Sequence, residues 1–123
     1  TARLLTDAGY TWYGDTLADD LPWVESIAGK KIVAIPLSTD VNDMRSMKDG
    51  APIASIVSTF EEQLMRLRET ESGAAQVDCT VHAHIFGRPH GAFYFERVVE
   101  MAAKSPDVWV GTRMEIANAV LNA

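Results

Sequence analysis

The three histidines of this 123-residue chain all fall within a stretch of nine residues, at His82, His84 and His90. The β-prone run 77–81 precedes them, and the loop 87–91, Gly-Arg-Pro-His-Gly, follows His84. This order predicts a strand that carries imidazoles to its carboxyl end. Active sites of α/β proteins lie at that end of the strands, so we interpret the segment as part of a functional site.

Imidazole has several chemical roles at such a place. The two-residue period of a strand predicts that His82 and His84 share one face. A neutral ring is a metal ligand or a general base, and a protonated ring is a general acid or an oxyanion donor. Either both rings function, or His84 is a structural neighbour of a functional His82, while His90 in its turn-rich loop is interpreted as structural. The spacings of zinc fingers and of H-E-x-x-H helices do not occur, so a metal needs ligands from outside this segment.

Acidic, polar and aromatic side chains mark two further candidate regions. The carboxylates of the acidic loop 14–23 either orient a base, bind substrate hydroxyls or cap the local backbone. An indole beside that loop either stacks on a sugar ring or packs in the core. The polar loop 37–51 is long enough to be a lid that selects substrates by size. Together with His84, the candidate substrate-binding residues are Asp15, Asp19, Asp20, Trp23, Asn42 and Asp43.

Hydrophobic periodicity indicates which elements position these residues. It predicts short strands over 10–13 and 32–35, helices after Pro52 and over 92–104, a strand over 108–110, and a final helix after a capping box of Thr112 and Glu115. Strands that alternate with helices predict parallel strands joined by right-handed crossover helices.

The expected fold class is therefore α/β, with residues 1–123 forming the carboxyl-terminal half of a distorted, TIM-like β/α barrel. A complete barrel takes about 250 residues, roughly twice this length. The helix-like residues 1–8 also suggest that the chain opens inside an element, so the first half of the domain is expected to be missing.

Composition excludes several classes of partner. The chain carries 11 basic and 17 acidic residues, a net charge of −6, so it has no basic stripe with which to bind nucleic acid. Cys79 is the only cysteine, which rules out an internal disulfide. The cysteine content therefore does not identify the cellular compartment, for which we favour the cytoplasm. No apolar run approaches the roughly 18 residues that span a membrane.

Three segments of the chain resemble motifs of one protein family. Residues 13–23 are similar to Y-D-S-S-L-x-x-D-D-x-P-Y, residues 80–89 to H-P-x-x-x-G-R-P, and residues 107–117 to d-V-W-x-x-T-x-x-E-I-A. In this order, these motifs resemble the polysaccharide deacetylases (NodB homology) of the allantoinase-like and peptidoglycan deacetylase-like branch. The chain departs from the pattern at Gly14, where the motif has Asp, and at Ala83, where it has Pro.

The resemblance implies a metal-dependent hydrolase of non-peptide C–N amide bonds, which deacetylates an N-acetylated sugar or glycan. It implies that His82 is the general acid, and that the acidic residues of the first motif orient or bind the substrate. The family holds its divalent metal, expected here to be zinc, with an Asp and two His near the start of the domain, outside this chain segment. The complete protein is then the enzyme, and this segment alone is expected to be inactive.

Two alternative functions stay open. The chain is either a non-catalytic carbohydrate-binding or assembly half-barrel, or part of an allantoinase-like hydrolase of a small cyclic ureide. The expected partners are a carbohydrate or small amide substrate and the remaining half of the barrel. Exposed edges of parallel strands also predict association into a homo-oligomer.

Overall fold

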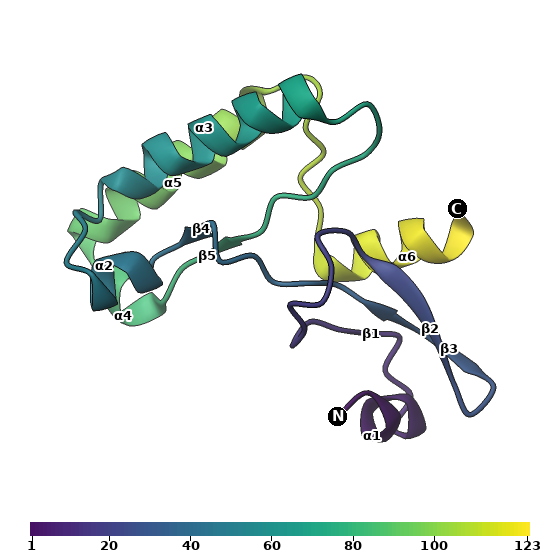
Figure 1. Cartoon of the computed structure of the whole chain (residues 1–123). Helices are drawn as coiled ribbons and strands as arrows, with labels where there is room; N and C mark the ends of the chain where they lie inside the picture. Colours follow the sequence, from purple (N-terminus) through teal and green to yellow (C-terminus); the bar gives the residue numbers. More distant parts are fainter. The chain divides into compact units, whose positions relative to one another are not determined.

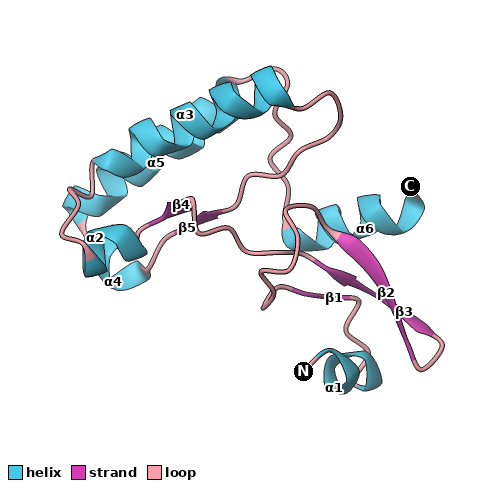
Figure 2. Ribbon diagram, viewed as in Figure 1, coloured by secondary structure: helices cyan, strands magenta, loops and turns pink.

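The computed structural model describes the backbone of residues 1–123 and every side chain except that of Arg45. It contains two compact units, one formed by Thr1–Leu37 with Gly111–Ala123 and the other by Ser38–Val110 (Figure 1). Each unit combines helices with strands, which confirms the α/β class (Figure 2). No closed barrel forms in the part of the chain that is described, and the half-barrel remains a prediction.

A three-stranded sheet forms the centre of the first unit, in the order β1 (Trp12–Tyr13), β3 (Lys30–Ala34), β2 (Trp23–Ile27). β1 runs parallel to β3, whereas β2 runs antiparallel to it. Ala28 and Gly29 join β2 to β3, and their φ angles of 51° and 79° are those of a two-residue hairpin turn. This turn sends β3 back beside β2, so the pairing of β2 with β3 departs from the expected parallel strands and makes the sheet mixed.

Two helices, α1 (Ala2–Asp7) and α6 (Arg113–Asn122), pack against this sheet. α6 begins with the expected capping box, in which the Thr112 hydroxyl accepts the N–H of Glu115 and the Glu115 carboxylate accepts the N–H of Thr112 at 2.7 Å. The backbone N–H and then the hydroxyl of Thr112 lower the pKa of Glu115. Behind this cap, Ala117 is buried against Val33 and Ile35, so the final helix is confirmed together with its first residue.

The second unit combines a short parallel sheet with four helices. β4 (Val41–Asn42) pairs with β5 (Cys79–Thr80). The helices are α2 (Met44–Lys48), α3 (Ser55–Thr70), α4 (Ala83–Phe86) and α5 (Pro89–Lys104). α3 and α5 lie side by side (Figure 1). Their apolar faces enclose one core, whose buried members are Val41, Ile56, Phe60, Leu64, Phe86 and Val98.

The polar segment 37–51 is not the continuous loop that the sequence predicts. Val41 and Asn42 form β4 because β5 offers them a partner, and the Asn42 side chain then accepts the N–H of Met44 at 2.9 Å, at the start of α2. The strand predicted over 77–81 contracts to Cys79–Thr80 for the same reason, since only these two residues lie beside β4.

Two further elements differ at their ends. The helix predicted over 92–104 begins earlier, at Pro89, whose fixed φ suits a first helical position. Residues 108–110 form no strand, and Trp109 and Val110 are each 61% exposed. Residues with high β propensity need a neighbouring strand to form one, and the described part of the chain places none beside them.

None of the described helices has both the length and the apolar character needed to cross a bilayer.

Candidate functional site

Parallel pairing of β4 and β5 positions the candidate site. Val41 lies opposite Cys79 and Asn42 opposite Thr80, and the next residue, Asp43, donates its N–H to the Thr80 carbonyl at 3.2 Å. Asp43 and His82 therefore follow the carboxyl ends of two adjacent parallel strands. This is the edge of a parallel sheet at which α/β proteins bind ligands.

Asp43 and His82 form a close pair through two hydrogen bonds. Asp43 Oδ1 lies 2.6 Å from His82 Nδ1, and Asp43 Oδ2 accepts the backbone N–H of His82 at 2.6 Å. The Asp43 side chain is fully buried, whereas the His82 side chain is 41% exposed. An ionised carboxylate can only accept, so Nδ1 carries a proton and Nε2 is the nitrogen that can exchange one. The arrangement can hold a histidine in one tautomer and one orientation for acid–base chemistry.

The short helix α4 starts at this pair. His82 occupies its N-cap position with an extended backbone, and its carbonyl accepts the N–H groups of Ile85 and Phe86. His84 belongs to α4, so the expectation that His82 and His84 share the face of a strand is corrected. Their rings still meet edge to face, with 5.6 Å between centroids. His90 instead contacts Tyr94 on α5, at 5.3 Å between centroids.

A close backbone contact fixes α4 against the start of α5. A Cβ atom on Gly91 would lie 2.6 Å from Phe86 Cα and closer still to the Ile85 carbonyl oxygen. Both contacts are with backbone, which has no room to give way. Gly91 therefore permits the approach of the two helices that supports the position of His82.

We expect Gly91→Ala to lower the free energy of unfolding by about 1–3 kcal/mol, the usual cost of overpacking. Urea denaturation of the variant and the wild type measures this difference. Gly73→Ala is the matched control, because a Cβ at Gly73 meets nothing within 4 Å. Equal stabilities for the two variants would show that the approach of α4 to α5 is not constrained at Gly91.

The other predicted substrate-binding residues divide between the units. Asn42 caps α2 beside Asp43, as described above. In the first unit, Asp19 Oδ1 accepts the N–H groups of Asp20 and Leu21, so this carboxylate shapes its own loop. Asp20 is exposed, and Asp15 lines a pocket of the same unit.

A polar cluster around Glu25 escaped the sequence predictions. Glu25 Oε1 accepts the Tyr13 hydroxyl at 2.8 Å and the Trp23 indole N–H at 3.1 Å. Burial, followed by the hydrogen bond and charge of Glu25 and the charge of Asp15, raises the pKa of Tyr13 to about 12. Trp23 and Glu25 lie two residues apart and so share one face of β2, and recognising that strand would have revealed the cluster. It ties the Trp23 indole to the sheet.

The role of Asp43 as the partner of His82 also escaped prediction, since the two residues are far apart in the sequence. Near them, burial and then the charges of Asp78 and Asp43 raise the pKa of Cys79 to about 11, which disfavours a nucleophilic thiolate.

Among the described residues, no three His, Cys, Asp or Glu side chains gather closely enough to hold a metal. The side chains that the structure describes thus do not offer the donor set of a metal centre.

No family model matches the chain, and no curated protein matches it either. Among solved structures, Puue allantoinase superposes with a TM-score of 0.80 at 26% sequence identity, over 94% of this chain and 40% of that protein. A Mycobacterium smegmatis protein assigned as a polysaccharide deacetylase superposes with a TM-score of 0.81 at 22% identity, over 98% of this chain and 44% of that protein. The chain spans less than half the length of each. The resemblance based on the three sequence segments is thereby confirmed at the level of the fold, which is similar to part of an allantoinase and to part of a polysaccharide deacetylase.

Proposed function

We propose that the chain is the carboxyl-terminal part of a hydrolase that removes the acetyl group from an N-acetylated sugar or glycan, with His82 as the general acid. The observation that carries the proposal is the pair formed by buried Asp43 and half-exposed His82. A carboxylate that fixes the tautomer of a half-exposed histidine leaves Nε2 available for acid–base chemistry, which supports a hydrolase. The similarity to an allantoinase and to a polysaccharide deacetylase supports the same chemistry, since both names denote cleavage of C–N bonds.

In the proposed reaction, water adds to the amide carbonyl and the C–N bond then breaks. The amine that leaves is a poor leaving group until it is protonated, and protonated His82 supplies that proton from Nε2. Asp43 keeps the Nδ1–H pointed at itself and stabilises the positive charge of the imidazolium before the transfer. The proton thus moves from His82 Nε2 to the departing nitrogen, and the ring remains bonded to Asp43 through Nδ1.

Further parts of the proposed site follow from the sequence. We assign His84, whose ring contacts that of His82, to the binding of substrate beside the proton donor. Asp15, Asp19, Asp20, Trp23 and Asn42 remain predicted substrate-binding residues. We also assign activation of the water, any divalent metal such as zinc, and the remaining strands of the barrel to a part of the protein outside this sequence.

A second candidate substrate is a small cyclic ureide. Its support is the sequence identity with Puue allantoinase, at 26% against 22% for the deacetylase. The same proton donor serves both reactions, because a ring-opening hydrolysis also breaks an amide C–N bond.

The direct test incubates the full-length protein with N-acetylglucosamine oligomers and with allantoin, each with and without added zinc. Release of acetate supports the deacetylase, and ring opening of allantoin supports the ureide hydrolase. No turnover of either compound under any condition would overturn the hydrolase proposal and favour the carbohydrate-binding half-barrel.

A further inference from the structure

Glu25 is a partly buried carboxylate of the first unit to which the proposed reaction gives no role. Its Oε1 accepts the Tyr13 hydroxyl at 2.8 Å and the Trp23 indole N–H at 3.1 Å. A single oxygen of the carboxylate thus holds both aromatic side chains. In the part of the chain that the structure describes, no donor is bonded to the other oxygen, Oε2, which can therefore accept a further hydrogen bond.

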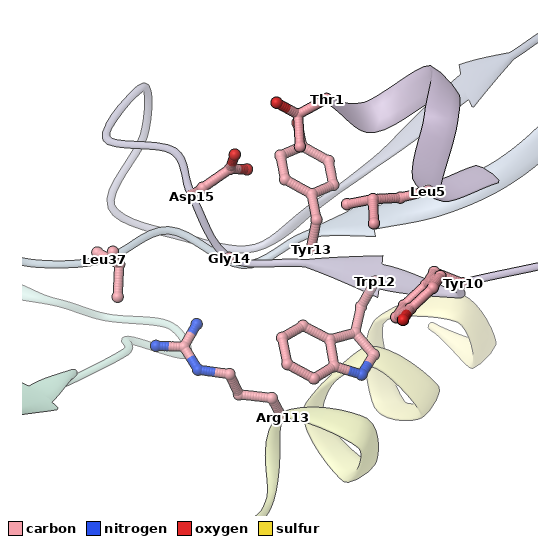
Figure 3. Close-up of a pocket in the computed structure, with 9 residues that line it drawn as sticks. All are labelled: Thr1, Leu5, Tyr10, Trp12, Tyr13, Gly14, Asp15, Leu37 and Arg113. Atoms are coloured by element: carbon pink, nitrogen blue, oxygen red, sulfur yellow. The ribbon is translucent and has the colours of Figure 1, made fainter. Parts of the chain in front are cut away.

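The register of the sheet explains why these side chains meet. Tyr13 on β1 and Trp23 on β2 both lie opposite Ala34 of the central strand β3, so they share one face of the sheet. Glu25 lies two residues beyond Trp23 along β2 and points to the same face. The small side chain of Ala34 does not obstruct contacts across β3. Trp12 belongs to the opposite face, and Figure 3 shows its indole and the Tyr13 ring on the two sides of β1.

The cluster of Tyr13, Trp23 and Glu25 lies at the edge of the sheet where β1 and β3 end. Tyr13 is the last residue of β1, and Ala34 is the last residue of β3. Trp23 is the first residue of β2, and it lies at the same edge because β2 runs antiparallel to β3. The carboxyl ends of parallel strands are where α/β proteins bind ligands. An indole and a carboxylate with an available oxygen are thus placed where a ligand is expected.

An indole beside a carboxylate is complementary to a sugar. Because the Trp23 N–H is already bonded to Glu25, the indole can offer a ligand its ring face but not its donor. An indole face packs against the C–H face of a sugar ring, and a carboxylate oxygen accepts a hydroxyl proton in a charge-assisted hydrogen bond.

We propose that Glu25 is a further substrate-binding residue, whose Oε2 accepts a hydroxyl of a sugar ring packed against Trp23. This assignment rests on the proposed function, because it takes the sugar of the proposed substrate as the ligand. It assigns Glu25 two roles, since Oε1 orients the indole on which the sugar lies and Oε2 contacts the sugar itself.

The test measures binding without turnover, so that a failure of this assignment can be distinguished from a failure of the hydrolase proposal. The full-length His82→Ala protein, which lacks the proposed proton donor, is titrated with the trimer of N-acetylglucosamine. NMR follows the indole N–H signal of Trp23, assigned with Trp23→Phe, and the trimer should shift this signal saturably. An unchanged Trp23 signal would overturn the assignment, whether or not the wild-type protein releases acetate from the trimer.

Two variants, each combined with His82→Ala, separate the role of Oε2 from the order of the cluster. Glu25→Gln keeps one oxygen for Tyr13 and Trp23 but puts an amide NH₂ in place of Oε2, and it should weaken trimer binding by about tenfold or more. Tyr13→Phe removes a donor from Oε1 but leaves Oε2 unchanged, and it should weaken binding by less than about threefold. Glu62→Gln makes the matched change at an exposed carboxylate and should bind the trimer as its parent does. Equal losses in Glu25→Gln and Tyr13→Phe, or no loss in Glu25→Gln, would overturn the proposal.

Discussion

Replacing His82 with alanine in the full-length protein is expected to lower kcat by about 10²–10⁴-fold, the usual contribution of a general acid. The departing amine then leaves without the proton that Nε2 supplies. Because binding of the substrate does not require this proton, KM should change far less than kcat. Steady-state kinetics on the substrate identified from the acetate-release and ring-opening assays provide the measurement.

His90→Ala is the matched control for this variant. It also removes an imidazole from this segment, but His90 is exposed. Its described ring contact is with Tyr94, on the same helix. Its kcat should equal that of the wild type. A His82→Ala enzyme with wild-type kcat, or a His90→Ala enzyme with an equal loss, would remove His82 from the role of general acid.

Asp43→Asn should cause the second large loss, again about 10²–10⁴-fold in kcat, as for a carboxylate that fixes the tautomer of a catalytic histidine. Asp43 accepts two hydrogen bonds from His82, one from the ring and one from the backbone. An amide has only one acceptor atom, so its NH₂ group would face either the ring nitrogen or the backbone N–H. The ring then turns away or adopts the wrong tautomer.

A structural role alone would not change the protonation behaviour of the enzyme, and this difference separates the explanations. We expect the pH dependence of kcat to change in Asp43→Asn, and ¹⁵N NMR of His82 to show an altered population of the two tautomers. Asp40→Asn makes the same chemical change at an exposed carboxylate of the same segment and should leave both readouts as in the wild type. An Asp43→Asn enzyme with a wild-type pH profile would contradict the positioning role of Asp43.

Local signals in the sequence predicted some of these features well. The final helix was predicted from Thr112 and Glu115, whose capping contacts are between neighbours in the chain and depend little on the rest of the fold. The long helix after Pro52 was predicted from apolar spacing, and its buried residues Ile56, Phe60 and Leu64 follow that spacing. His82 was expected at the carboxyl end of a strand, and β5 ends at Thr80, two residues before it.

Features that depend on distant partners could not be predicted in this way. Asp43 meets His82 only because β4 and β5 pair, and each of these strands is two residues long. The hairpin of β2 and β3 depends on Ala28 adopting a positive φ, which alanine rarely does and which no composition rule signals. Residues 108–110 have the composition of a strand, but composition cannot supply the neighbour that a strand requires.

Asp43 accepts hydrogen bonds from both the ring and the main chain of His82, so heating that breaks one of these bonds is expected to break the other. Any opening that separates β4 from β5 breaks both bonds together, so the proton donor and the small sheet come apart as one cooperative event. That sheet contains only four residues, whereas the core between α3 and α5 is extensive. Local opening of this kind costs less free energy than global unfolding. We therefore expect the proposed activity of the full-length protein to be lost on heating at a lower temperature than the one at which the helices melt.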